Sequence, residues 1–198
     1  MELGFSGARV EAIATLADAN KAMIYYHFGS KQGLYRAVLR RLFANILEEV
    51  ERLRAADLAP EEKLGALYGR ITRHFGDRPA LPQIMLREVL AGGKAMDAEA
   101  ARTLGVVLGF VTETIQEGVR TGSLRNVHPL LVHTTMLGPL MLHFAGRSFR
   151  ERLLPLQMPQ ISPPKDEEVL AHLLEVLDRT LTPPLRNSSH TATIRNTK

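Results

Sequence analysis

Apolar residues recur at helical spacing along almost the whole of this 198-residue chain. Leu64, Leu67 and Ile71, for example, are three and four positions apart, which places their side chains on one face of an α-helix. No stretch shows the strict alternation of apolar and polar residues that is typical of a half-buried strand. The sequence therefore predicts an all-α protein, and the chain is long enough to bury a core.

Capping and turn residues set the expected helix ends. Ser30 is a suitable N-cap for a long helix that runs to about Arg54. The segment 59–62, Ala-Pro-Glu-Glu, is typical of a helix start, because proline fits the first turn and acids interact favourably with the N-terminal dipole. Gly122 can end a helix that begins near Asp97. Further helices are expected near 81–90, 129–150 and 165–181, with a proline-rich loop at 155–164.

The periodicity also predicts which side chains face inward. On the first short helix these are Val10, Ile13, Ala14 and Ala17. On the long helix they are Leu34, Val38, Leu42, Phe43, Ile46, Val50 and Leu53. Glu88 is expected on an exposed polar face.

Composition excludes several classes of protein. The absence of cysteine rules out a disulfide scaffold and a thiolate metal site. No apolar run approaches the ~20 residues that span a bilayer, and the N-terminus lacks a signal-peptide pattern, so we expect a cytoplasmic protein without a membrane partner. The first 45 residues carry six lysines and arginines against three acids, which suits a nucleic-acid-binding head.

The most informative segment for function is 20–35, with the sequence NKAMIYYHFGSKQGLY. It collects tyrosines, a histidine and two lysines around the apolar pair Ile24 and Phe28. Such side chains can bind phosphates and sugars and reach base edges. The two short helices that meet across 18–21 have the dimensions of a helix-turn-helix unit, whose second helix lies in the major groove of DNA.

The pattern resembles the tetracycline-repressor (TetR) family of bacterial regulators. The matching residues are Gly4-Phe5, Val10, Ile13-Ala14, Ala17, the block Tyr25-Tyr26-His27-Phe28-Gly29-Ser30-Lys31, and Leu34. Direct resemblance covers roughly residues 4–43, and beyond them only the helical layout is similar. The resemblance implies a helix-turn-helix DNA-binding domain at 1–45 and a helical ligand-binding and dimerisation domain at 46–181. The polar composition from 182 to 198 predicts a disordered tail.

The resemblance also implies roles for individual residues. Lys21, Ala22 and Met23 open the recognition helix and would face base edges. The residues similar to the family's phosphate and sugar contacts are Tyr25, Tyr26, His27 and Lys31, with Arg9 as a further phosphate candidate.

The chain departs from the family pattern around the first helices. Ala8-Arg9 offers no capping hydroxyl, and Asp18 stands where the turn usually has glycine. Family members carry a full amphipathic helix before Gly4-Phe5, whereas only Met1-Glu2-Leu3 precede the motif here. We therefore hypothesise a truncated start. That helix normally covers four side chains, so we expect an exposed apolar patch at Ile13, Ile24, Phe28 and Leu34.

An effector pocket is expected in the second domain, because ligand sites combine apolar walls with a few polar groups. The candidates are Met85, Phe110, His133, Met136 and Met141, which fit plain core packing equally well. No carboxylate recurs at ligand spacing beside His133, so neither a metal site nor a cofactor is expected.

Together these features predict a ligand-responsive transcriptional repressor. It would bind a palindromic double-stranded DNA operator as a homodimer, pair through the helices at 129–150 and 165–181, and respond to a small-molecule effector of unknown identity. The sequence lacks the common phosphate-loop, nucleophile-elbow and zinc-helix motifs, so an enzyme is not expected. Two alternatives stay open: a helical ligand-binding or scaffold protein whose truncated head no longer binds DNA, and an all-α enzyme with an unrecognised site.

Overall fold

The computed structural model describes residues 8–183, which form nine α-helices and no strand. The helices are α2 (Val10–Leu16), α3 (Lys21–Phe28), α4 (Lys31–Ala55), α5 (Pro60–Asp77), α6 (Ala80–Leu90), α7 (Ala98–Thr121), α8 (Pro129–Ala145), α9 (Arg147–Gln157) and α10 (Asp166–Leu181). The all-α prediction is confirmed. Gly4-Phe5, the start of the chain and all but the first two residues of the predicted tail lie outside the described residues.

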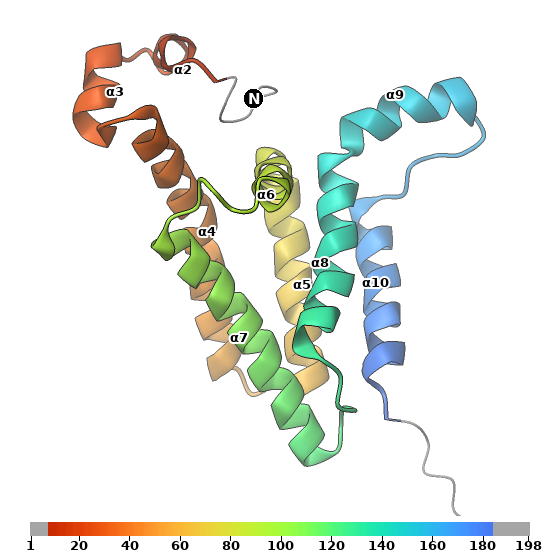
Figure 1. Cartoon of the computed structure of the whole chain (residues 1–198). Coiled ribbons are helices and arrows are strands. Elements are labelled where there is room, and N and C mark those ends of the chain that lie inside the picture. The colour runs from red at the N-terminus through yellow and green to blue at the C-terminus, as the bar shows by residue number, and fades with distance from the viewer. Residues whose placement is uncertain (1–7, 184–198) are drawn as a thin grey trace, which may run out of the picture.

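The long helices form one bundle, and α2 and α3 lie beyond the N-terminal end of α4 (Figure 1). In the bundle, α4 packs mainly on α7 and also on α5, α6 packs on α8, and α10 packs on α5 and α8. Two separate cores result. The large core contains side chains of α4, α5, α6, α7, α8 and α10. The small core contains Val10, Ala14 and Ile24 in the N-terminal head.

The helix ends follow the capping residues. The Ser30 hydroxyl accepts a hydrogen bond from the backbone N–H of Gly33 at 3.0 Å. Asp97 does the same for Ala100 at 2.9 Å, and Gly122 ends α7 in the left-handed conformation with φ 81°. These caps satisfy backbone groups that have no partner inside the helix.

The predicted inward stripes are wrong at two positions, Ala17 and Val38. Ala17 is exposed, because α2 ends one residue earlier. Val38 is 39% exposed, whereas the neighbouring Leu39 is only 1% exposed and lies in the large core. Val38 lines a groove between the head and α6, so the inward face of α4 shifts where the helix passes from the head to the bundle.

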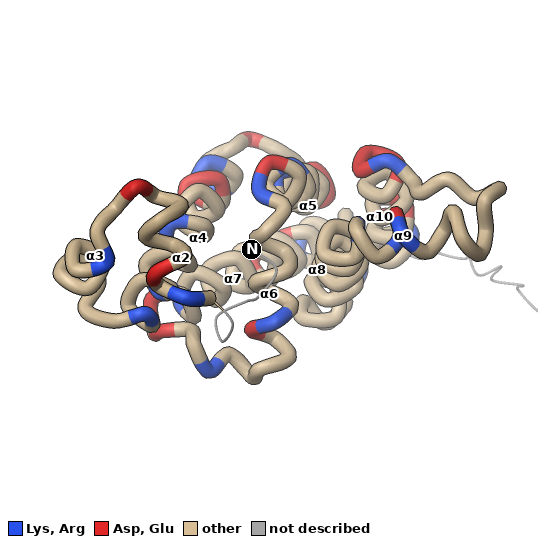
Figure 2. The backbone as a smooth tube through the Cα atoms, turned by 90° about the horizontal axis from the view of Figure 1, so that it is seen from above, with Lys and Arg blue, Asp and Glu red and all other residues tan. Residues whose placement is uncertain are grey.

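The region 129–165 also differs from the prediction. The helix expected at 129–150 ends at Ala145, and a separate helix, α9, continues past Pro155 into the segment predicted as a loop. No residue of α9 is buried, so its apolar residues follow no core-facing stripe that periodicity could detect. Figure 2 shows α9 on the side of the molecule opposite α3.

None of the helices between residues 8 and 183 has the length and apolar character needed to cross a membrane.

Candidate nucleic-acid interface

The turn between α2 and α3 is closed by a Schellman motif. The N–H of Ala19 donates to the carbonyl of Ala14 at 2.9 Å, and the N–H of Asp18 donates to Thr15 at 3.3 Å. These two bonds form when the residue just after the helix adopts the left-handed conformation, and glycine usually occupies this position. Asp18 adopts that conformation with φ 48°, so the turn forms without the glycine that the family usually carries.

Helix α3 begins directly after this turn. The side chain of Asn20 caps it by accepting from the N–H of Ala22 at 2.8 Å. Only Ile24 is buried in α3, at 8% exposure. The other side chains of the helix face solvent, and Tyr26 is the most open of its large ones at 82%. A helix held by one inward side chain leaves almost its whole surface free to enter a groove.

The structure places the predicted base-contacting residues on the exposed start of α3. Ala22 and Met23 are exposed, and Met23 is 51% accessible. Lys21 is exposed but forms an ion pair with Glu11 of α2, and its ammonium lies 5.9 Å from the ring centre of Tyr25. The Glu11 carboxylate raises the pKa of Lys21, so this lysine is charged at neutral pH. Contact with a base would therefore require Lys21 to leave Glu11.

The predicted phosphate-contacting residues lie on α3 and at its junction with α4. Tyr25 is 41% exposed, and the rings of Tyr26 and His27 meet edge to face at 5.3 Å. Gly29 ends α3 with φ 71°, which lets the chain turn at once into α4. Lys31 is the first residue of α4 and is partly exposed.

Arg9 occupies the N-cap position of α2, where it is exposed and makes no side-chain capping bond. This agrees with the expected lack of a capping hydroxyl. All eight predicted DNA-binding residues thus belong to α2, α3, their caps and the start of α4, at the end of the molecule seen at the upper left of Figure 1.

An apolar groove of about 350 Å³ runs between the head and α6. Its apolar walls come from α2, α4 and α6 and include Ile13, Leu34, Val38 and Ile84. The expected apolar patch is therefore present at Ile13 and Leu34, and Phe28 is 38% exposed. It is absent at Ile24, which the small head core buries.

None of the five predicted effector-binding residues lines this groove. Phe110 and Met136 are 1% and 0% exposed in the large core, and Met85 and Met141 pack against it. His133 lies with its Nδ1 3.3 Å from the hydroxyl of Tyr68, which is fully buried. Burial lowers the pKa of His133 and raises that of Tyr68, so both are uncharged at neutral pH. Phe110 and Met136 thus belong to the core, whereas Met85, His133 and Met141 are partly buried, and a role for these residues in effector binding stays a prediction.

Glu88 corrects the sequence prediction most directly, because it is only 7% exposed. Its carboxylate accepts from the hydroxyl of Tyr35 at 2.8 Å and from the N–H of Ala95 at 3.3 Å. Burial and this carboxylate raise the pKa of Tyr35. The contact links α4, which begins in the head, to the C-terminal end of α6.

In the region from 8 to 183 no three histidine or acidic side chains are grouped so that they could hold a metal ion.

Comparison with known proteins gives the same assignment for the head. Residues 1–38 match the family model described as "Bacterial regulatory proteins, tetR family". The transcriptional repressor NicS of Pseudomonas putida is 34% identical over 125 residues, which are 62% of this chain and 59% of NicS. The transcriptional regulator RutR of Escherichia coli K12 is 31% identical over 130 residues, 65% of this chain and 60% of RutR. The matched region thus spans about 60% of these relatives' length.

Solved structures show that the similarity of fold extends over most of the chain. The transcriptional regulator FadR from Bacillus subtilis, in complex with stearoyl-CoA, aligns with a TM-score of 0.69 at 16% identity, covering 90% of this chain and 91% of FadR. Reduced NemR from E. coli aligns with a TM-score of 0.66 at 18% identity, covering 93% and 91%. The family model and the two relatives agree that the N-terminal part of the chain is similar to regulators of the TetR family, and the solved structures show the same fold over most of the chain.

Proposed function

We propose that this protein is a cytoplasmic, ligand-responsive transcriptional repressor that binds a palindromic DNA operator as a homodimer and has no enzymatic activity. The observation that carries the proposal is the exposure of α3. One inward residue anchors this helix, while the side chains that can contact bases and phosphates face solvent. DNA binding is assigned to residues 1–45, and effector binding and pairing to 46–181.

Exposed apolar side chains on α8 and α9 support the homodimer. Leu131 and Leu142 of α8 are 63% and 60% exposed, and Phe149 and Leu156 of α9 are 67% and 77% exposed. A surface with so many large apolar groups is typical of a protein–protein interface. The inward stripe of α10, by contrast, is buried in its own chain, so α10 would contribute its outer face. Leu142→Glu should therefore shift the protein toward monomer in sedimentation measurements.

An effector would bind within the helices of 46–181. The Tyr68–His133 pair is a polar contact in otherwise apolar surroundings, the usual composition of a ligand site. FadR, which shares the fold, is bound to stearoyl-CoA, and this supports an effector with a large apolar part. The ligand would act through its different affinity for two arrangements of the heads.

The test is a gel-shift and footprinting assay on DNA that flanks the gene of this protein, at several salt concentrations. Tyr26→Ala and Lys31→Ala should each weaken binding to the protected sequence about tenfold, the effect of losing one charge-assisted hydrogen bond. Lys165→Ala is the matched control, because it removes an exposed lysine at the start of α10 and should leave affinity unchanged.

Unchanged affinity in both head variants would contradict the assigned interface. Binding without sequence preference and with a steep salt dependence would leave only non-specific attraction to DNA. That outcome would favour the second candidate, a helical ligand-binding protein without operator recognition, which the open groove at Ile13 and Leu34 supports.

A further inference from the structure

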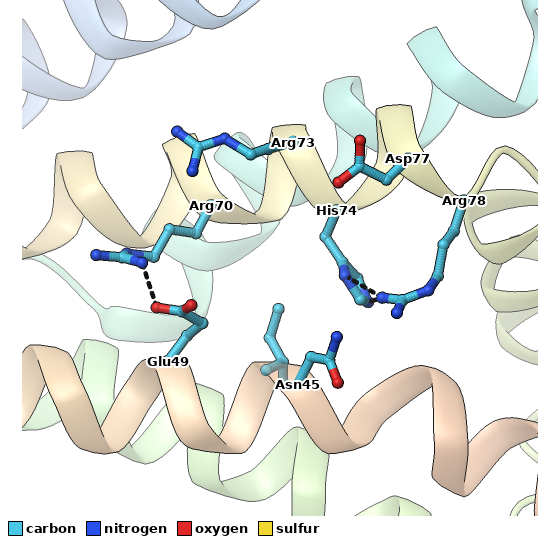
Figure 3. A pocket seen from close by; sticks show the side chains of 8 residues that line it. Asn45, Glu49, Arg70, Arg73, His74, Asp77 and Arg78 are labelled. Atoms are coloured by element: carbon cyan, nitrogen blue, oxygen red, sulfur yellow. Dashed lines mark hydrogen bonds and ion pairs between the residues drawn. The ribbon is translucent and has the colours of Figure 1, made fainter.

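A second cleft, of about 330 Å³, lies between α4 and α5 in the bundle. Figure 3 shows its lining side chains, which come from α4 (Asn45, Ile46 and Glu49), from α5 (Arg70, Arg73, His74 and Asp77) and from Arg78 at the end of α5. Only Ile46 is apolar. Its lining contains neither the predicted DNA contacts nor the Tyr68–His133 pair, so the cleft needs an explanation of its own.

His74 holds Arg78 in place within this cleft. The Nε2 of His74 lies 2.9 Å from the carbonyl oxygen of Leu42 on α4. Nη1 of Arg78 lies against the ring, 2.7 Å from Nδ1 and 3.2 Å from Nε2. A carbonyl can only accept, so Nε2 carries the proton, and Nδ1 is the nearer acceptor for the guanidinium, which can only donate. Burial and the guanidinium together lower the pKa of His74, which keeps the ring neutral. Arg78 is therefore positioned without being neutralised.

Three arginines line the cleft against the two carboxylates of Glu49 and Asp77, which leaves one positive charge in excess. Glu49 pairs with Arg70 and also with Arg52 outside the cleft. Among residues 8–183, neither Arg73 nor Arg78 forms an ion pair with a carboxylate. In Figure 3 Arg70, His74 and Arg78 extend toward α4, whereas Arg73 and Asp77 lie farther from it. The amide of Asn45 adds a neutral donor on the α4 side.

We propose that this cleft binds a small molecule carrying an oxyanion, either a carboxylate or a phosphate. Guanidinium groups match both in shape, because two parallel N–H donors can meet two oxygens. Arg78 would bind the anion with the donors that His74 leaves free, Asn45 would donate from the opposite wall, and Arg70 would add positive charge. The cleft volume is at the lower end of ligand pockets, which suits a compact metabolite.

The position of the cleft gives the anion a regulatory consequence, and this step rests on the proposed DNA-binding function. Helix α4 begins in the head at Lys31 and reaches Asn45 in the bundle. An anion shared by Asn45 and Arg78 would tie α4 to α5 and so favour one position of the head. It would alter operator affinity only to the extent that it binds the two head positions differently.

The experiment is titration calorimetry of the full chain with inorganic phosphate and, separately, with succinate, each at constant ionic strength against chloride. At least one should bind at a single site, and the tighter of the two identifies the class of oxyanion. Asn45→Asp keeps the side-chain size and places a negative charge in the cleft, so it should weaken binding at least about tenfold. Asn45 is exposed, so this variant should fold normally, which circular dichroism checks. Arg78→Gln should have a similar effect.

Arg179→Gln is the control, because it also removes one arginine charge but lies on α10, where it is 76% exposed and paired with Glu175. Its affinity for the anion should equal that of the unmodified protein. Equal binding by Asn45→Asp and the unmodified protein, or binding of neither anion, would overturn the site. An operator assay with and without the bound anion is read separately. Anion binding that leaves operator affinity unchanged overturns only the regulatory step, and a protein that binds no operator contradicts the proposed function but not the cleft.

Discussion

Asp18 offers the sharpest test of the head, because one residue closes the turn of the helix-turn-helix unit in a conformation that glycine prefers. A left-handed conformation costs a non-glycine residue roughly 1–2 kcal/mol. Glycine avoids this cost but loses more backbone entropy on folding, about 0.5–1 kcal/mol. With φ 48° at this position, Asp18→Gly should be more stable than Asp18→Ala by about 0.5–1 kcal/mol. Both variants remove the same carboxylate, so the comparison isolates the backbone from the charge.

Hydrogen exchange at Ala19 measures this difference locally. The amide of Ala19 is one of the two donors of the Schellman motif, so its exchange requires the turn to open. Exchange should be about two- to fivefold slower in Asp18→Gly than in Asp18→Ala, the factor that corresponds to this free energy. If the whole chain unfolds together, the melting temperatures should differ by about 1–4 °C in the same direction. Equal exchange, or slower exchange in Asp18→Ala, would refute the left-handed turn.

Three further predictions concern the bundle. Gly118→Ala should destabilise the protein by about 1–3 kcal/mol in denaturant titration, because a Cβ there would lie 2.8 Å from the Cβ of the buried Leu124; a neutral effect would contradict this packing. Tyr35→Phe should cost about 1–3 kcal/mol, because it removes a hydrogen-bond donor from the buried carboxylate of Glu88, and the test fails if Tyr35→Phe melts like the unmodified protein. Burial lowers the pKa of His133 in the folded state, so the unfolded chain binds more protons and stability should fall as pH drops below about 6.5. His133→Gln should reduce that slope in melting curves recorded between about pH 7 and 5, and an unchanged slope would assign the effect to other groups.

The sequence predicted those parts of the fold that depend on neighbours along the chain. Ser30, Asp97 and Gly122 cap their helices as expected, because a cap is satisfied by backbone groups a few residues away. The burial of Glu88 could not be predicted in this way. Its partner Tyr35 lies 53 residues away on another helix, and only the tertiary fold brings the two together. The position of Glu88 among apolar neighbours was the one sequence signal that pointed to burial of its carboxylate.

Proline placement explains why α9 was missed. Four prolines between 155 and 164 predicted a loop, but Pro155 lies within α9, and the helix ends at Gln157. Because α9 buries no side chain in its own chain, its sequence lacks the core-facing periodicity that would have identified the helix. The α4–α5 cleft was missed for a related reason. Its residues come from α4, α5 and the end of α5, which meet only after folding, and its charged residues look like ordinary surface charges in the sequence.

In α3 the family motif is a clearer signal than the helical periodicity of apolar residues. With Ile24 as its one buried residue, α3 has almost no amphipathic signal, so its identification depended on the motif. The motif could not reveal that Lys21 is already paired with Glu11. If Lys21 reads a base, binding must exchange one exposed ion pair for another contact, and such pairs contribute little in water. Glu11→Gln releases Lys21 and removes a negative charge from the head, so it should raise affinity for the operator more than for unrelated DNA in gel-shift titrations. An equal gain for both DNAs would show that Lys21 contributes only non-specific attraction to phosphates.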